Sequence, residues 1–199
     1  MISFLEIENI EPLSLFKSYY DKAQECNQEH IEAMCINSFD IDNNQPESRF
    51  VNLKFIKGAE FIFFSNYEGP KANQFHKNPK ISAIFFWNKT YTQIKLKGEI
   101  FKTDKLFCDN YFAQRNTKKN ALSISSNQSK VIESYDDVIN KYKETLQNGD
   151  LTTRPDYWGG FSFIPNYFEF WRGNENRLNE RKVFIKSQNQ KWKKLYLEP

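Results

Sequence analysis

The feature that most constrains the fold is a series of short segments rich in β-branched and aromatic residues. Runs of this kind, bounded by turn residues, are typical of antiparallel strands. Turn signals such as Lys57-Gly58 and the polar segment Asp40–Pro46 separate them at short intervals. The pattern predicts a closed or nearly closed antiparallel barrel. The predicted strands are Ala33–Phe39, Arg49–Ile56, Phe61–Ser65, Ile81–Trp87, Tyr91–Lys102, Phe161–Phe163, Tyr167–Trp171, Lys182–Lys186 and Trp192–Tyr196.

Helical spacing of apolar residues interrupts the strand pattern in several places. Pro12 is tolerated in a first helical turn, and an amphipathic helix is predicted over roughly residues 12 to 26. Further helices are predicted at Pro70–Asn78, at about Asp104–Phe112 and at Tyr135–Leu146. The fold class is therefore mainly β with helices (α+β). No linker divides the chain, so residues 1–199 are expected to form a single domain.

The composition argues against several classes of protein. Cys26, Cys35 and Cys108 form no CxxC pair and there are only two histidines, so neither a metal site nor a disulfide framework is expected. The net charge of +3 is small and dispersed, which gives no sign of a nucleic-acid partner. No apolar run reaches membrane-spanning length and the first residues lack a signal-peptide pattern, so we expect a cytoplasmic protein.

No glycine-rich phosphate loop is present, so a phosphate-bearing ligand would be held by cationic side chains and hydroxyls. The candidates are mostly ordinary surface charges when taken one by one. Tyr111, Arg115 and Lys119 are spaced at i, i+4 and i+8 and would share a helical face if the helix continues past Asn116-Thr117. The candidate cations are Arg49, Lys54, Lys71, Arg115, Lys118 and Lys119.

A second group of unusual residues lies near the C-terminus. Gly159-Gly160 stands between large aromatic residues, which indicates close approach of the backbone to another group. Trp171 is followed by Arg177 and Arg181, which together offer a stacking surface and anion donors. The alternative is a Trp-rich core strand followed by a basic turn.

Several motifs resemble those of the pyridoxamine 5'-phosphate oxidase family. They are Arg49–Lys54, then Phe64-Ser65-Asn66 with Lys71, then Gln128-Ser129, and finally Trp158-Gly159-Gly160-Phe161, Glu169-Phe170-Trp171 and Arg177-Leu178-x-x-Arg181. The resemblance runs from about Glu11 to Pro199. It implies an FMN-binding split β-barrel that works as a homodimer, with residues 150–199 as a dimerisation and active-site region and with each flavin site built from both chains.

The resemblance also implies roles for individual residues. Arg177 and Asn179 would lie at the reacting end of the substrate. Arg181 is expected to be an otherwise solvated ligand clamp whose loss weakens FMN binding and leaves the fold intact. FMN would contact Arg49, Phe50, Val51, Asn52, Leu53, Lys54, Phe64, Ser65, Lys71, Gln93, Gln128, Ser129, Trp171 and Arg181, and the substrate would contact Lys54, Tyr111, Arg115, Lys119, Arg177, Leu178 and Asn179.

The implied reaction converts pyridoxamine or pyridoxine 5'-phosphate to pyridoxal 5'-phosphate, with oxygen as electron acceptor and hydrogen peroxide as by-product. Four residues depart from the family pattern. Pro70 replaces an arginine, Lys119 a serine, Asn179 a histidine and Phe64 a tyrosine. Two alternatives therefore stay open: a sister flavin oxidase for another substrate, of the phenazine-pathway type, and a non-catalytic flavin-binding protein.

Overall fold

The computed structural model describes residues 1–199 and alternates strands with short helices. Nine strands and five α-helices follow one another along the chain. In order they are β1 (Ser3–Leu5), α1 (Glu11–Glu25), β2 (Ala33–Asp40), β3 (Gln45–Lys57), β4 (Glu60–Asn66), α2 (Pro70–Lys77), β5 (Lys80–Trp87), a 3-10 turn (Asn88–Thr90), β6 (Thr92–Lys102), α3 (Lys105–Gln114), α4 (Thr117–Ser125), α5 (Tyr135–Asn148), β7 (Trp158–Arg172), β8 (Glu180–Lys186) and β9 (Trp192–Leu197).

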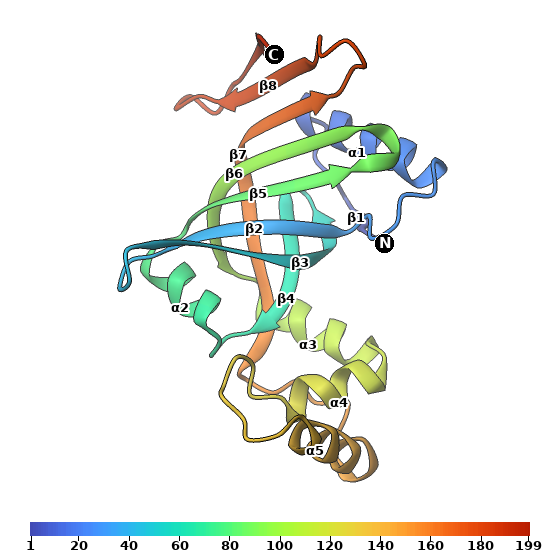
Figure 1. Ribbon diagram of the computed structural model, residues 1–199, viewed down its shortest axis with the longest axis vertical. Helices are drawn as coiled ribbons and strands as arrows, with labels where there is room; N and C mark the ends of the chain where they lie inside the picture. The colour runs from blue at the N-terminus through green and yellow to red at the C-terminus, as the bar shows by residue number, and fades with distance from the viewer.

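Six of the strands close into a ring. Pairing runs from β3 through β2, β5, β6 and β7 to β4, and β4 pairs with β3 again. Every pairing in this ring is antiparallel, which confirms the predicted barrel. The short strand β1 adds to β3 in parallel, and β8 and β9 continue the sheet beyond β7 at the opposite end from α3, α4 and α5 (Figure 1).

The barrel interior is filled with aromatic side chains, and α1 covers it. Phe16 of α1 is fully buried and contacts Phe61 and Phe85 edge-on, with ring centroids 5.2 and 5.5 Å apart. Pro12 stands in the first turn of α1, as predicted. The core comprises 26 buried residues, so the chain has the single hydrophobic interior that the strand pattern requires. No helix has both the length and the apolar character needed to cross a membrane.

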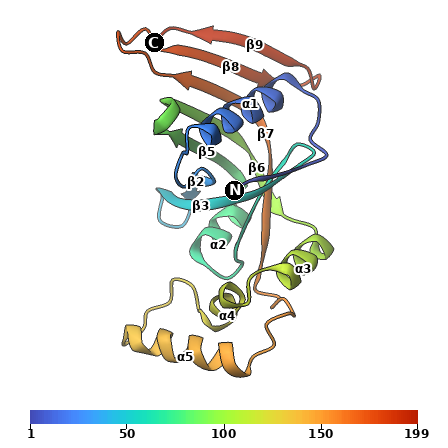
Figure 2. The same ribbon diagram turned by 90° about the vertical axis from the view of Figure 1, so that its right-hand side faces the viewer.

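The strand β7 differs from the prediction, which divided it between Phe161–Phe163 and Tyr167–Trp171. It is one strand of 15 residues that runs through Pro165. The proline is accommodated where the register with β6 shifts between Lys97 and Gly98, and the missing Cβ of Gly98 leaves room for the carbonyl of Ile164. The first half of β7 pairs with β4 and the second half with β8, so this strand joins the two ends of the molecule (Figure 2).

Two elements, β1 and α4, were not predicted. β1 has only three residues, and α4 buries only Asn120 and Ala121, so neither shows an apolar pattern of its own. β3 also begins earlier than predicted, because Pro46 pairs with Phe39 at the edge of the hairpin. The predicted helices at the other positions are confirmed within a few residues.

Candidate functional site

A cleft of about 460 Å³ lies on the outside of the barrel, bounded by β3, β4, the start of α2 and the junction of α3 with α4. It brings together residues that are far apart in the sequence. All of its lining residues except Asn116 were predicted to contact FMN or substrate. They are Phe50, Val51, Asn52, Lys54, Phe64, Ser65, Lys71, Tyr111, Arg115, Asn116, Lys119 and Gln128.

Strand β3 forms one side of the cleft. Alternate side chains point into the barrel core, and a bulge after Leu53 changes the direction of the next side chain. Leu53 is fully buried and its side chain belongs to the barrel core, so only its backbone is available to a ligand. The register shift that follows leaves Lys54 without a partner on β4. Lys54 therefore reaches the cleft, where its Nζ lies 3.5 Å from the carboxylate of Glu32.

Aromatic rings form the floor of the cleft. Phe64 stacks on Tyr111 with centroids 4.1 Å apart and on Trp158 at 5.2 Å. Phe55 supports Tyr111 edge-on at 5.1 Å. Burial raises the pKa of the Tyr111 phenol, so this group stays protonated at neutral pH and can donate a hydrogen bond. Trp158 was noted in the sequence as part of a motif, but its place under Phe64 was not predicted.

The cleft is lined by basic residues and by no acidic residue. Lys71 is 9% exposed, and its Nζ donates to Ser65 Oγ at 3.1 Å without any carboxylate partner. Burial, and then the nearby charge of Arg49, lower the pKa of Lys71. Ser65 in turn donates to Gln128 Oε1 at 3.3 Å. Unpaired cations in a partly buried cleft favour an anionic ligand.

Arg115 reaches the cleft by a route that differs from the prediction. The expected shared face of Tyr111, Arg115 and Lys119 on one helix is wrong, because α3 ends at Gln114 and Arg115 is extended. Asn116 caps the N-terminus of α4 by accepting from Lys118 N, and Asn and Asp favour this position over a helix interior. All three residues nevertheless line the same cleft.

The Arg115 guanidinium is positioned by the first turns of α4. Its Nη1 donates to Ser123 Oγ at 2.7 Å, to Asn120 Oδ1 at 3.2 Å and to the carbonyl of Lys119 at 3.2 Å. The guanidinium lies 4.8 Å from the centre of the Trp158 ring. All of these acceptors are neutral, so the positive charge is fixed in place and remains available.

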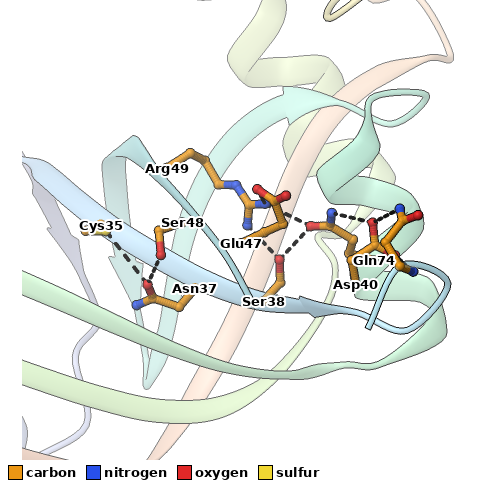
Figure 3. A network of polar contacts seen from close by, with 9 residues as sticks. Cys35, Asn37, Ser38, Asp40, Glu47, Ser48, Arg49 and Gln74 are labelled. Carbon is orange, nitrogen blue, oxygen red and sulfur yellow. Dashed lines mark hydrogen bonds and ion pairs between the residues drawn. The ribbon is translucent and has the colours of Figure 1, made fainter. Parts of the chain in front are cut away.

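Arg49 lies beside the cleft and does not line it. Its guanidinium donates to Ser38 Oγ at 2.6 Å and to Gln74 Oε1 at 2.8 Å (Figure 3). Ser129, another predicted contact, lies in a neighbouring pocket of about 900 Å³. Gln128 lines both cavities and separates them.

The remaining predicted residues lie at the far end of β7. Gln93 pairs directly with Trp171, and Trp171 pairs directly with Arg181, so the three form one row across β6, β7 and β8. The turn between β7 and β8 carries Arg177 and the largely exposed Leu178. This distal row and turn lie at the β8 end of the barrel, away from the helices that border the cleft (Figure 1). One chain therefore does not bring all the predicted residues together.

Arg181 is not solvated as expected. Its Nε and Nη2 donate to Glu169 Oε1 at 3.0 and 2.6 Å, and Nη1 donates to the carbonyl of Glu198 at 3.1 Å. Glu169 is 5% exposed and also accepts from the Tyr167 hydroxyl at 2.8 Å. Arg181 thus neutralises a buried carboxylate, so we now expect its loss to lower stability, in contrast to the sequence-based prediction that the fold stays intact.

The turn that precedes Arg181 is held by one backbone hydrogen bond and by the Asn179 side chain. Arg177 has φ of 60°, in the left-handed region, and donates its N–H to the carbonyl of Asn174. Asn179 Oδ1 accepts from the N–H of Asn174 at 3.0 Å. Asn179 therefore shapes the turn that presents the exposed Arg177 side chain.

Comparison with known proteins identifies the family. The family model described as Pyridoxamine 5'-phosphate oxidase matches residues 21–137, and Pyridoxine 5'-phosphate oxidase C-terminal dimerisation region matches residues 158–199. A curated relative from Coxiella burnetii, named pyridoxine/pyridoxamine 5'-phosphate oxidase, is 34% identical over 95% of this chain and 96% of its own length. The chain belongs to the pyridoxamine 5'-phosphate oxidase family. A relative of the same name from Pelagibacter ubique is 30% identical over 97% of this chain and 94% of its own.

Solved structures show the same fold as this family member. The crystal structure of PhzG from Burkholderia lata, in complex with tetrahydrophenazine-1-carboxylic acid, has a TM-score of 0.89 at 22% identity and covers 98% of this chain and 100% of its own. A pyridoxamine 5'-phosphate oxidase-related, FMN-binding protein from Nostoc punctiforme has a TM-score of 0.82 at 11% identity, over 96% of this chain and 100% of its own. The predicted split barrel and the predicted class of enzyme, an oxidoreductase of the pyridoxamine 5'-phosphate oxidase type, are both confirmed.

Proposed function

We propose that the chain is an FMN-dependent oxidase that converts pyridoxamine or pyridoxine 5'-phosphate to pyridoxal 5'-phosphate. The observation that carries the proposal is a cleft with four basic residues, no acidic residue and an aromatic floor, in a member of this family. Both FMN and the substrate combine a flat ring with a phosphate, and the lining suits both parts. The relatives named as pyridoxine/pyridoxamine 5'-phosphate oxidases support the choice of substrate.

FMN fits the donor set on this side of the barrel. Arg49, Lys71 and Ser65 would hold its phosphate, because the two cations lie near one another and lack a buried carboxylate partner. The backbone of Phe50 to Lys54 would border the flavin ring. When bound, FMN supplies the two-electron chemistry and passes the electrons to oxygen, which forms hydrogen peroxide.

The chain's own side chains would bind and orient the substrate. Tyr111 and Arg115 would take its phosphate, the phenol as a protonated donor and the guanidinium as a fixed cation, with Lys54 and Lys119 nearby. Binding the phosphate as a handle fixes the position of the reacting carbon, and this fixed position contributes to the rate. Arg177 would then lie over the substrate ring, in a turn shaped by Asn179.

A homodimer would complete the site. The row of Gln93, Trp171 and Arg181, together with the turn at Arg177, lies away from the cleft of its own chain, so these groups would serve the cleft of a second copy. The match of residues 158–199 to a dimerisation region supports this arrangement. A monomeric mass in solution, with flavin fully bound, would contradict it.

Turnover is the direct test of the proposed function. The FMN-loaded protein is incubated with pyridoxamine phosphate or pyridoxine phosphate while aldehyde and hydrogen peroxide are measured. Equal amounts of both products are expected, because each substrate molecule gives up two electrons to one oxygen molecule. Absence of aldehyde with FMN fully bound would rule the proposal out.

A second candidate is a sister oxidase for another anionic substrate. It is favoured by Lys119 and Asn179, which replace the family's usual serine and histidine at the substrate end. The variant Asn179→His discriminates between the two, because histidine restores the usual residue. Activity on pyridoxamine phosphate that is kept or raised supports the leading function. Absence of that activity in both proteins supports the sister oxidase.

A further inference from the structure

The Arg49 guanidinium is fixed by two neutral acceptors. Nη1 donates to Ser38 Oγ at 2.6 Å and Nη2 donates to Gln74 Oε1 at 2.8 Å (Figure 3). The Ser38 hydroxyl also donates to Gln74 Oε1 at 2.7 Å, so the three side chains form a closed triangle. Ser38 and Gln74 are each 5% exposed. The arginine is therefore held rigidly without losing its charge to a partner.

The orientation of the Gln74 amide is set from its other side. Its Nε2 donates toward Asp40 Oδ2 at 3.5 Å, so the amide oxygen is the atom that faces Arg49. Asp40 is held in turn by the side chain and backbone of Asn43. The one carboxylate within ion-pair distance of Arg49 is that of Glu47, at 3.8 Å, and its side chain is 45% exposed.

Lys71 lies one helical turn before Gln74 on α2 and is also buried. Burial lowers the pKa of Lys71, and the like charge of Arg49 lowers it further. Two like charges near one another, with no buried carboxylate between them, cost free energy until an anion binds. A negatively charged acceptor at position 74 would neutralise Arg49, and the two cations would then gain less free energy from binding an anion.

We propose that Gln74 and Ser38 are positioning residues that keep Arg49 fixed beside Lys71 without a buried carboxylate partner, so that the site selects a flavin ending in a phosphate over one that lacks it. The proposal rests on the proposed binding of FMN and assigns the selectivity to two neutral side chains that do not line the cleft.

The test compares the dissociation constants of FMN and riboflavin for the full-length chain after removal of flavin, measured by fluorescence quenching. Gln74→Glu keeps the shape of the side chain but places a carboxylate on Arg49. We expect FMN to bind at least about tenfold more weakly to this variant while the riboflavin affinity stays the same, so the ratio of the riboflavin constant to the FMN constant falls about tenfold. Ser38→Ala and Gln74→Met remove an acceptor without adding charge and should lower the ratio less.

Asn73→Asp is the matched control, since it makes the same change of charge at an exposed neighbour on α2 that has no bond to Arg49. It should keep the wild-type ratio. An unchanged ratio in Gln74→Glu, or an equal fall in Asn73→Asp, would overturn the inference. Equal affinity of the wild type for both flavins would overturn this inference alone, whereas absence of binding to either flavin would overturn the proposed function as well.

Discussion

Lys71 and Arg115 in the cleft and Arg172 and Arg181 in the distal region have different kinds of partner. In the cleft, Lys71 and Arg115 donate only to neutral oxygens. In the distal region, Arg181 is bonded to the buried Glu169, and Arg172 lies 3.2 Å from Glu180. Lys71, Arg115 and Arg181 were all predicted as site residues. The paired arginines join β7 to β8, whereas Lys71 and Arg115 have no carboxylate partner and remain available to a ligand. The charge of a side chain therefore indicates a binding role only after its partners are known.

The largest expected effect is on stability, at Arg181. Arg181→Ala would leave the buried carboxylate of Glu169 without its cation, and we expect the free energy of unfolding of the flavin-free protein to fall by about 3 kcal/mol. Urea unfolding measures this directly. Arg177→Ala is the control, because Arg177 makes no ion pair and its loss should change the free energy of unfolding by no more than about 0.5 kcal/mol. Similar losses of free energy of unfolding in the two variants would contradict the claim that the paired Arg181 stabilises the fold and the unpaired Arg177 does not.

Arg115 should have the largest effect on catalysis among the cleft cations. In Arg115→Gln we expect the KM for pyridoxamine phosphate to rise about tenfold or more, because a charge-assisted contact to the phosphate is lost. The KM for unphosphorylated pyridoxamine should stay the same. Steady-state kinetics with both substrates measures the difference. Lys118→Gln, a neighbouring residue outside the cleft lining, provides the control, and an equal rise for both substrates would argue against a phosphate contact.

The pH dependence of stability should differ between wild type and Arg181→Ala. Burial raises the pKa of Glu169, but the hydrogen bonds from Arg181 and Tyr167 outweigh burial and hold it below 4.5. The carboxylate then stabilises the fold above about pH 4.5, and this contribution is lost as the pH falls through the lowered pKa. Without Arg181, only the Tyr167 hydrogen bond and the charge of Lys95 oppose burial, so the pKa of Glu169 is higher than in the wild type and protonation relieves the penalty as the pH falls.

The difference in free energy of unfolding between the two proteins should therefore be largest near pH 7 and should narrow towards pH 4. Urea midpoints at four pH values test this. Arg172→Ala serves as the comparison, because its partner Glu180 is 37% exposed on the side chain and should give a small difference that changes little with pH. If the difference in free energy of unfolding between wild type and Arg181→Ala did not change with pH, an unpaired Glu169 carboxylate would not be the cause of the lost stability.

Lys119 should have the smallest effect of the four. It is exposed at the mouth of the cleft, so solvent screens its charge. We expect Lys119→Ser to raise the KM for pyridoxamine phosphate by about two- to threefold. A much larger loss of activity, on any substrate, would show that this residue contacts the substrate closely and would favour the sister oxidase.

Much of the fold was predictable because its strands are long enough to show alternation. β5 and β6 alternate buried and more exposed residues along most of their length, and the sequence places both within a few residues. The break in the helix at Arg115 was harder to place. Asn116 can occur inside a helix, and only the hydrogen bond that it accepts from Lys118 N shows that it begins a new one. The continuity of β7 was also missed, because the register shift beside Gly98 that accommodates Pro165 is not visible in the sequence.

The site was predictable as a set of residues but not as an arrangement. The motifs gave eight of the residues that line the cleft, including Phe64 and Lys71, and the roles implied by the family resemblance added Tyr111, Arg115 and Lys119. They did not show that Arg181 is bound to Glu169, because the register that brings β8 beside β7 is not visible in the sequence. They also did not show that Ser38 and Gln74 meet at Arg49, since these residues come from β2 and α2 and are unremarkable one by one.

The continuity of β7 has a consequence for dimers assembled from two different variants. One strand begins at Trp158, under the cleft, and reaches Trp171 in the distal row, a span of roughly 43 Å if fully extended. In the proposed dimer, each site takes its cleft from one protomer and its distal row from the other. A protomer damaged only at Arg115, paired with one damaged only at Arg177, would therefore place both lesions in one site and leave the second site intact. A heterodimer of two inactive variants would thus have half the activity of the wild-type dimer.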